Sequence, residues 1–204
     1  MSLLYHIAYR IGFRPWENRA AYRRGLGGDA ASQASSPPPE LEALVEGPDA
    51  LSPGRALDLG CGAGIDSVYL ATHGWDVTGV EYEQRAIADA QERARAAGVS
   101  PRFIQGDVTR LSDLGIGSGF TLILDVGCFH TLPRRSRDEY VRQVTAVAAP
   151  DATLLLFAFG GIPGTAPREE VEARFSPAWD VAWHEQPHVR RMFRSAWYLM
   201  HRRT

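Results

Sequence analysis

The sequence predicts an α/β domain in which helices cover both faces of a mostly parallel, seven-stranded sheet. Two observations support this fold class. Short runs rich in leucine and β-branched residues alternate with longer amphipathic patterns, and two consecutive strand patterns close the chain. The 204 residues, 45% of them apolar, suit one globular domain. We therefore expect a single domain with three layers.

The alternating part of the chain starts with a short helical pattern at residues 40–46. Strands buried on both faces read as nearly continuous apolar runs. Five such runs occur, at residues 56–59, 76–80, 102–104, 121–126 and 153–159. Helical periodicity separates them at residues 65–72, 83–97 and 135–148. This order predicts βαβ units and a parallel sheet.

The end of the chain has a different pattern. A helix is expected at residues 168–175, followed by strands at residues 179–186 and 191–202. Only a few residues around Pro187 and His188 join these two strands, and so short a connection makes the pair antiparallel. The sheet should therefore end in an antiparallel hairpin.

The first part of the chain reads as a separate cap. Residues 1–24 have helical spacing of apolar side chains, at Leu3, Leu4, Ile7, Ala8 and Ile11. Residues 25–39 are rich in Gly, Ala and Ser and end in three prolines, a composition typical of a flexible linker. The expected organisation is a helical cap or lid at 1–24, a linker at 25–39 and the main domain at 40–204.

Composition argues against several classes of partner. The chain has 22 basic and 24 acidic residues, so no overall positive field is available to hold nucleic acid. Its two cysteines suggest neither a disulfide framework nor a zinc site, and we expect no bound metal. There is no signal-peptide pattern and no apolar run of 18 residues. We expect a cytoplasmic monomer or homodimer that acts on a small molecule, without nucleic-acid or membrane partners.

The stretch LDLGCGAGID, residues 57–66, carries the clearest functional signal. Gly60, Gly62 and Gly64 follow a strand and open a helix, where backbone N–H groups meet a ligand. A phosphate-binding P-loop requires a lysine, and the chain contains none. A dinucleotide-binding turn requires a third glycine where Ile65 stands, so an NAD-dependent oxidoreductase is only an alternative.

The same stretch resembles the first motif of class I S-adenosylmethionine-dependent methyltransferases. The resemblance covers roughly residues 40–202 and implies a Rossmann-like fold with S-adenosylmethionine as cofactor and S-adenosylhomocysteine as product. It places cofactor contacts at successive strand ends: ribose at Glu81, followed by Tyr82, and adenine at Asp107 with its neighbour Val108. At the next strand end, Asp125, Val126 and Gly127 would face the methionine part.

Asp58 lies within an apolar strand, where an unpaired carboxylate is costly. We expect it to accept hydrogen bonds from N–H groups of the glycine turn near the methionine amine, or only to brace that turn. Together with Glu81, Asp107 and Asp125 it would surround the ligand with negative charge. Such a site favours a sulfonium cation and repels a pyrophosphate.

The motif DVGCFHTLP and the segment GFRPWE are similar to small actinobacterial-type enzymes near the thiopurine and tellurite-resistance methyltransferases. This resemblance implies that an N-terminal aromatic segment, including Trp16, closes over the cofactor. An N-terminal helix that packs its aromatics against the sheet edge is the alternative. The full set of these aromatic residues is Tyr5, Tyr9, Phe13 and Trp16.

His130 is the best-placed general base for a hydroxyl acceptor, because its ordinary pKa lies near neutrality. It could equally orient a loop. Cys128 reads as a small packed residue, since direct methyl transfer needs no covalent protein intermediate. The predicted function is methyl transfer to a small molecule, with an O, S or N nucleophile left open. A protein that binds S-adenosylmethionine without transferring its methyl group is the alternative.

Overall fold

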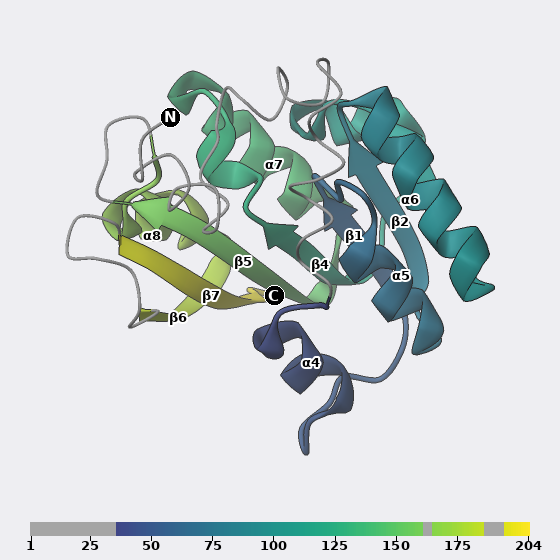
Figure 1. Cartoon of the computed structure of the whole chain (residues 1–204). Helices are drawn as coiled ribbons and strands as arrows, with labels where there is room; N and C mark the ends of the chain where they lie inside the picture. The colour runs from purple at the N-terminus through teal and green to yellow at the C-terminus, as the bar shows by residue number, and fades with distance from the viewer. Residues whose placement is uncertain (1–35, 161–164, 186–193) are drawn as a thin grey trace, which may run out of the picture.

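A computed structural model describes residues 36–160, 165–185 and 194–204. Seven strands form one sheet in the order β3-β2-β1-β4-β5-β7-β6 (Figure 1). Strands β1 to β5 pair in parallel, whereas β7 is antiparallel to both β5 and β6, so the predicted sheet and hairpin are confirmed. The strands are β1 (Arg55–Leu59), β2 (Asp76–Glu81), β3 (Arg102–Gln105), β4 (Phe120–Val126), β5 (Ala148–Gly160), β6 (Trp179–Glu185) and β7 (Arg194–Arg202).

Helices cover the sheet on both faces. On one face lie α4 (Pro39–Glu46), α5 (Ile65–Thr72) and α6 (Gln84–Ala97), and on the other lie α7 (Arg137–Val147) and α8 (Arg168–Phe175) (Figure 1). Three 3₁₀ segments complete the fold: η1 (Val108–Leu114), η2 (Phe129–Thr131) and η3 (Arg134–Ser136). The predicted three layers are therefore present.

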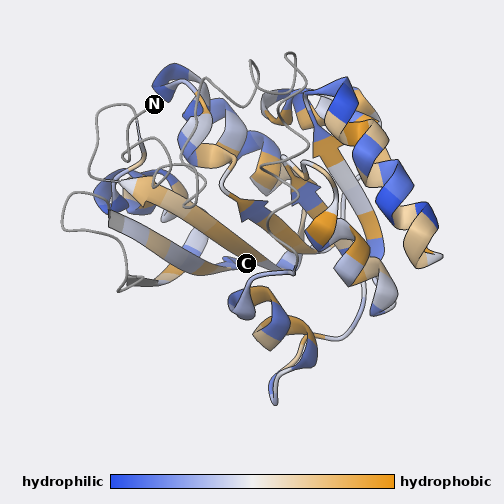
Figure 2. Ribbon diagram, viewed as in Figure 1, coloured by the Kyte–Doolittle hydropathy of each residue, from blue (hydrophilic) through white to orange (hydrophobic). Residues whose placement is uncertain are grey.

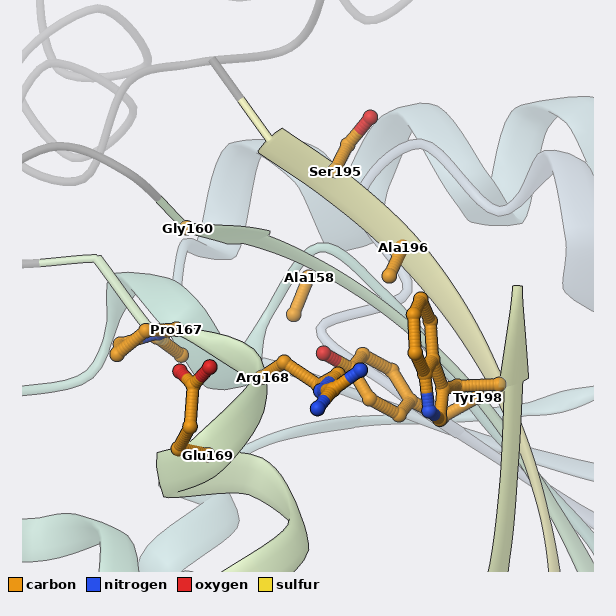
Figure 3. A pocket seen from close by; sticks show the side chains of 10 residues that line it. Ala158, Gly160, Pro167, Arg168, Glu169, Ser195, Ala196 and Tyr198 are labelled. Carbon is orange, nitrogen blue, oxygen red and sulfur yellow. The ribbon is translucent and has the colours of Figure 1, made fainter. Parts of the chain in front are cut away.

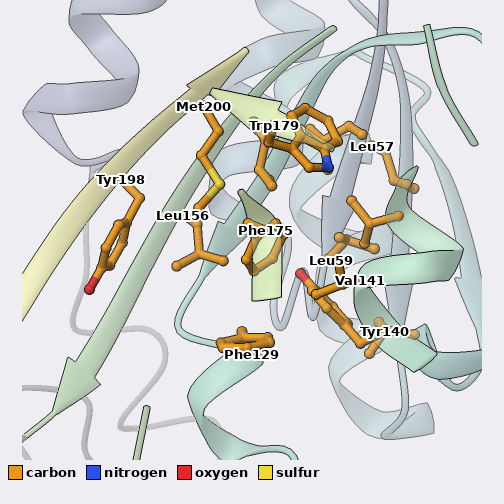
Figure 4. Close-up of a cluster of buried hydrophobic side chains, with 14 of the residues drawn as sticks. Leu57, Leu59, Phe129, Tyr140, Val141, Leu156, Phe175, Trp179, Tyr198 and Met200 are labelled. Carbon is orange, nitrogen blue, oxygen red and sulfur yellow. The ribbon is translucent and has the colours of Figure 1, made fainter. Parts of the chain in front are cut away.

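Apolar side chains fill both layers between helices and sheet. The larger cluster joins β1, β4, β5 and β7 to α7 and α8, and within it the Phe129 ring meets Tyr140 at a tilt and Phe175 edge-on (Figure 4). The smaller cluster lies under α4 and α5 around Leu41, Leu70 and Trp197. Figure 2 shows the same division as apolar strands between helices that alternate in hydropathy. The rigid sheet thereby fixes the loops at the ends of its strands.

Some element boundaries differ from the sequence prediction. Strand β5 starts at Ala148 instead of residue 153, because Ala148 pairs with Phe120 ahead of a register shift in the ladder. Pro150, which cannot donate a ladder hydrogen bond, lies in this irregular part. Helix α7 starts at Arg137, two residues later than predicted, because residues 134–136 form a 3₁₀ turn.

Other predictions fall outside the described residues. The expected helical cap at residues 1–24, with Trp16 and the other lid aromatics, is among them, as are most of the linker and the hairpin connection at Pro187 and His188. In the part of the chain that the structure describes, no helix combines the length and the apolar character needed to cross a membrane.

Candidate functional site

The glycine turn joins β1 to α5 and is tied to the neighbouring strand. The N–H groups of Gly60 and Cys61 donate to the Val80 carbonyl at 2.8 and 3.2 Å. Gly60 has φ +71°, and a Cβ there would lie 2.9 Å from Cβ of Cys128. Gly64 has φ +76°, and its Cβ would lie 2.7 Å from Cβ of Ala90 in α6. Both positions thus require glycine, for backbone conformation and for space.

Glu81 ends β2 beside this turn, where the sequence places it. Its Oε2 accepts from the N–H of Gly62 at 3.1 Å, and its Oε1 accepts from the N–H of Glu83 at 2.9 Å. A carboxylate has about four lone-pair sites, so each oxygen can still accept from a ligand hydroxyl. Tyr82 follows with 43% of its surface exposed. The backbone therefore holds the Glu81 carboxylate in place and leaves part of its hydrogen-bonding capacity available.

Asp58 makes a different contact from the one expected. It is 2% exposed, and its Oδ2 accepts from the hydroxyl of Ser67 in α5 at 2.6 Å. The N–H groups of the three glycines in the turn donate elsewhere, to Val80, Glu81 and Cys61. The expectation that these N–H groups bind Asp58 is therefore wrong, because its side chain points under α5. Burial raises the pKa of Asp58 to about 6, against the lowering effect of Ser67.

Sequence reasoning missed a second carboxyl group in this region. Asp66 lies in the first turn of α5, and burial, followed by repulsion from Asp58, raises its pKa to about 8. An acidic residue directly after the glycine motif was the available signal. The two carboxyl groups oppose each other's ionisation, and a bound cation would relieve that repulsion.

Asp107 lies where the sequence predicts, at the end of β3. Its Oδ1 accepts from the N–H and the hydroxyl of Thr109 at 2.9 and 2.7 Å, which caps η1. Val108 beside it is buried. The N–H of Gly106 donates to the Glu81 carbonyl at 2.9 Å, so the ends of β2 and β3 are held together. The predicted ribose and adenine residues therefore share one edge of the sheet.

Asp125 does not face this edge with its side chain. It is fully buried and accepts from the N–H groups of Cys128 at 2.7 Å and Phe129 at 2.9 Å and from the Tyr140 hydroxyl. Burial raises its pKa to about 7. The carboxyl group thus holds the turn after β4 from inside the core. The prediction that this side chain meets the cofactor is therefore corrected.

The two residues after Asp125 are more accessible. Val126 is 38% exposed, and Gly127 has φ +96°. Their place at the end of β4 agrees with the predicted position. Only the Asp125 carboxyl group has a different role from the one expected. The turn that starts here leads into η2 and His130.

His130 is 1% exposed, and neither ring nitrogen has a hydrogen-bond partner. Its ring meets Phe159 edge-on, with 5.1 Å between centroids. Burial lowers its pKa to about 4; the Phe157 backbone opposes this shift but makes no geometrically sound hydrogen bond with the ring. The imidazole is therefore neutral at physiological pH, and both its nitrogens are available to a ligand.

Arg137 fixes the backbone that carries His130. This 1% exposed guanidinium donates to the carbonyls of His130 at 3.1 Å and Leu132 at 3.2 Å. It also pairs with Glu170 of α8, at 3.2 Å. A buried charge needs such partners. Sequence reasoning missed Arg137, because one arginine in a helical pattern gives no sign of burial.

Cys128 reports the electrostatic field between the strand ends. Burial raises the pKa of its thiol, and the carboxyl groups of Asp125, Glu81, Asp107 and Asp58 raise it further. A thiol with a raised pKa is a poor nucleophile, which agrees with its interpretation as a packed residue. The four carboxyl groups therefore act on one place, where they favour positive charge.

A cavity of about 320 Å³ lies away from these residues, on the α8 side of the sheet (Figure 3). Ala158, Pro167 and Tyr198 line it, and the Arg168 guanidinium lies 4.3 Å from the centre of the Trp183 ring. Among the residues that the structure describes, no group of three or more His, Cys, Asp and Glu side chains is arranged to hold a metal ion.

A glycine turn after β1, with carboxyl groups at the ends of β2 and β3, is an arrangement with which α/β domains of this kind hold a nucleoside. A sequence model described as a methyltransferase domain matches residues 56–151. An uncharacterised methyltransferase of Schizosaccharomyces pombe is 29% identical over 105 residues, covering 52% of this chain and 71% of that protein.

Two further similarities agree with this class. The 2-heptyl-1-hydroxyquinolin-4(1H)-one methyltransferase of Mycobacteroides abscessus is 30% identical over 154 residues, covering 71% of this chain and 66% of that protein. The N-methyltransferase NodS of Bradyrhizobium japonicum shares the fold, with a TM-score of 0.67, 18% identity and coverage of 80% and 84% of the two chains. The chain belongs to the class I S-adenosylmethionine-dependent methyltransferases, as the resemblance predicts.

Proposed function

We propose that the protein binds S-adenosylmethionine at the strand ends and transfers its methyl group to a small molecule, releasing S-adenosylhomocysteine. Glu81 would accept from the ribose hydroxyls, and Asp107 from the adenine amine. Asp58 acts on the cofactor through the negative field and through α5. The complete cofactor site in this proposal comprises Asp58, Gly60, Gly62, Gly64, Glu81, Tyr82, Asp107, Val108 and Val126, with Trp16 retained from the sequence prediction.

The effect of four carboxyl groups on the Cys128 thiol is the observation that carries this proposal. Burial raises the pKa of this thiol, and Asp125, Glu81, Asp107 and Asp58 raise it further, so these carboxyl groups all act on the space beside it. A sulfonium cation is stabilised there, whereas a pyrophosphate is repelled. A Cβ on Gly60 would lie 2.9 Å from Cβ of Cys128, which places the glycine turn beside this residue. The donor set therefore fits the cofactor of the family.

When bound, the cofactor supplies a methyl group on positively charged sulfur, and the C–S electron pair stays on sulfur as the methyl group leaves. The chain has to hold the acceptor in line and dry. A neutral His130 nitrogen can accept the proton of an acceptor hydroxyl as the new O–C bond forms, and then release it to water. Its low pKa makes it a weak base. Acceptors that ionise readily, such as phenols and thiols, are therefore favoured.

One relative supports a small-molecule acceptor. The methyltransferase of Mycobacteroides abscessus is named for a hydroxylated quinolinone, and its similarity extends over 71% of this chain. By this analogy the acceptor of the present protein is a small molecule.

A panel of thiols, phenols and amines tests the proposal, with formation of S-adenosylhomocysteine as the readout. We expect saturable cofactor binding by calorimetry and turnover with at least one class of acceptor. Binding without turnover across the panel would favour the alternative of a binding protein that lacks transfer activity. Binding of NADH but not of S-adenosylmethionine would overturn the proposal.

A further inference from the structure

Buried polar atoms without partners gather in one part of this molecule. In the described residues, six buried side-chain nitrogen or oxygen atoms have no hydrogen-bond partner. Four of the six belong to three residues: both ring nitrogens of His130, Oγ of Ser195 and Nε1 of Trp197. Native proteins satisfy most buried polar atoms, so such a concentration requires an explanation.

These three residues belong to one aromatic cluster. Phe159 pairs with Ser195 and Phe157 with Trp197 across β5 and β7, so their side chains share one face of the sheet. Ring centroids are 5.1 Å apart for His130 and Phe159, 5.0 Å for Phe159 and Phe157, and 4.9 Å for Phe157 and Trp197. The acceptor cluster, as we call His130, Ser195, Trp197, Phe157 and Phe159, is thus continuous.

Of the acceptor cluster, only Ser195 is also among the residues that line the cavity near α8. Figure 3 shows the Ser195 hydroxyl directed to the opposite side of β7 from Ala196, whose side chain faces that cavity. His130, Ser195 and Trp197 are 1%, 2% and 3% exposed. Bulk water is therefore excluded from the three groups, although each still needs a hydrogen-bond partner.

The acceptor cluster lies next to the proposed methyl donor. In the turn after β4, a Cβ at Gly127 would lie 3.4 Å from Cε1 of His130. Cys128 of that turn also lies beside the glycine turn, since a Cβ at Gly60 would lie 2.9 Å from its Cβ. His130 therefore stands at the end of the cluster nearest the negative field, and Trp197 stands farther along the chain of ring contacts. A ligand on the cluster would present its His130 end to the cofactor.

We propose that the acceptor cluster binds a flat aromatic molecule with a hydroxyl at His130 and a second hydrogen-bond acceptor at Trp197. This inference rests on the proposed function and names its substrate class. The indole N–H of Trp197 only donates, so its partner must be a carbonyl, ether or ring nitrogen. Ser195 can donate or accept beside it, and aromatic rings stack against Phe157 and Phe159.

Calorimetry on the full chain saturated with S-adenosylhomocysteine tests this directly. 7-Hydroxycoumarin carries a hydroxyl and a carbonyl at opposite ends of a flat ring system, and 2-naphthol lacks the carbonyl. We expect Trp197→Phe to raise the Kd of 7-hydroxycoumarin about five- to tenfold, the effect of one lost hydrogen bond. The Kd of 2-naphthol should change less than about twofold, since its ring contacts remain.

Trp75→Phe is the matched control. Trp75 is 5% exposed, has an unpartnered Nε1 and belongs to the same core cluster as Trp197, but it precedes β2, which three strands (β1, β4 and β5) separate from β7. This variant should leave both Kd values unchanged. If Trp197→Phe does not fold, the Kd values of 7-hydroxycoumarin and 2-naphthol are compared in Ser195→Ala instead.

Equal effects on both ligands, or no effect on either, would overturn this inference. The proposed function has a separate readout, because binding and turnover of S-adenosylmethionine with the wider acceptor panel do not depend on Trp197. A protein that methylates thiols while 7-hydroxycoumarin and 2-naphthol bind alike retains the proposed function and loses the substrate class.

Discussion

The two parts of the candidate site differ in how their polar groups are satisfied. Around β1 to β3, Asp58, Glu81 and Asp107 all accept hydrogen bonds from nearby residues. Beyond β4, the polar atoms of His130, Ser195 and Trp197 have no such partners. The first part is held in shape by its own contacts, whereas the second depends on what it binds. Affinity for the cofactor and choice of acceptor should therefore respond to different substitutions.

The largest expected effect concerns the backbone of the first part. Gly64→Val introduces a branched side chain at φ +76°, with its Cβ 2.7 Å from Ala90. We expect a loss of about 3 kcal/mol or more in the free energy of unfolding, measured by urea denaturation. Gly98→Ala is the control: its φ is +70°, but nothing lies within 4 Å of the added Cβ. A loss of only about 1 kcal/mol is expected there, and equal losses would contradict the packing argument.

His130→Ala tests the second part. If its neutral ring takes the acceptor proton, turnover of hydroxyl acceptors should fall about 10²-fold, while thiolates, which need no base, lose little. The readout is kcat for a phenol and a thiol in parallel. His73→Ala, at the end of α5, serves as the control. A similar kcat for both variants with the phenol would assign His130 an orienting role.

Glu81→Ala should act on the cofactor alone. Loss of charge-assisted hydrogen bonds to the ribose hydroxyls is expected to weaken cofactor binding by about 1.5 to 3 kcal/mol in calorimetry. Acceptor KM at saturating cofactor should hardly change. The neighbouring Glu83→Ala provides the comparison. Residue 83 donates to Glu81 through its backbone N–H, so this substitution leaves the Glu81 carboxylate in place. Unchanged cofactor affinity in Glu81→Ala would refute the ribose assignment.

The smallest effect concerns the pH dependence of stability. The pKa of Asp66 is about 8 against an ordinary 3.8, so the folded state binds its proton more tightly than the unfolded state does. The free energy of unfolding therefore falls as pH rises towards 8. His130 adds a contribution at the lower end of the range from pH 6.5 to about 8.5, because its pKa is 6.5 when unfolded and about 4 when folded, but this contribution is common to the parent protein and its variants and cancels in their comparison.

The variant Asp66→Asn should consequently lose less Tm than the parent protein between those two pH values. Asp76→Asn, which changes an exposed carboxylate at the start of β2, should follow the parent. Cofactor binding should also flatten the parent's profile, because the cation lowers the pKa of Asp66. Superimposable profiles for Asp66→Asn and the parent, without ligand, would contradict the proposed titration.

The sequence was a good guide to which elements form and where their ends meet. Glu81 and Asp107 follow apolar runs, and parallel strands bring such positions to one edge, so their placement was predictable. The direction of Asp125 was not. In LILDVG both faces of the strand are apolar, so no alternation shows which face a carboxyl group takes. The contacts of the Asp58 side chain were predicted wrongly for the same reason.

The residues of the acceptor cluster were harder to predict from the sequence for a second reason. His130 was recognisable as a titratable residue after β4, but its lack of partners depends on β5 and β7, which come later in the chain. Ser195 and Trp197 read simply as parts of an amphipathic strand. Burial of Arg137 depends likewise on Glu170 of another helix. Such properties arise from packing between distant segments, which periodicity does not report.

The contact between Gly60 and Cys128 has a consequence for reach. A Cβ built on Gly60 would lie 2.9 Å from Cβ of Cys128, closer than such atoms approach in proteins, so the two loops pack closely and the side chain at position 128 limits their approach. One loop belongs to the side that holds the donor, and the other leads to His130. The contact therefore acts as a spacer that sets the gap the methyl group must cross. A bulkier side chain at position 128 would widen that gap without altering any residue that binds either molecule.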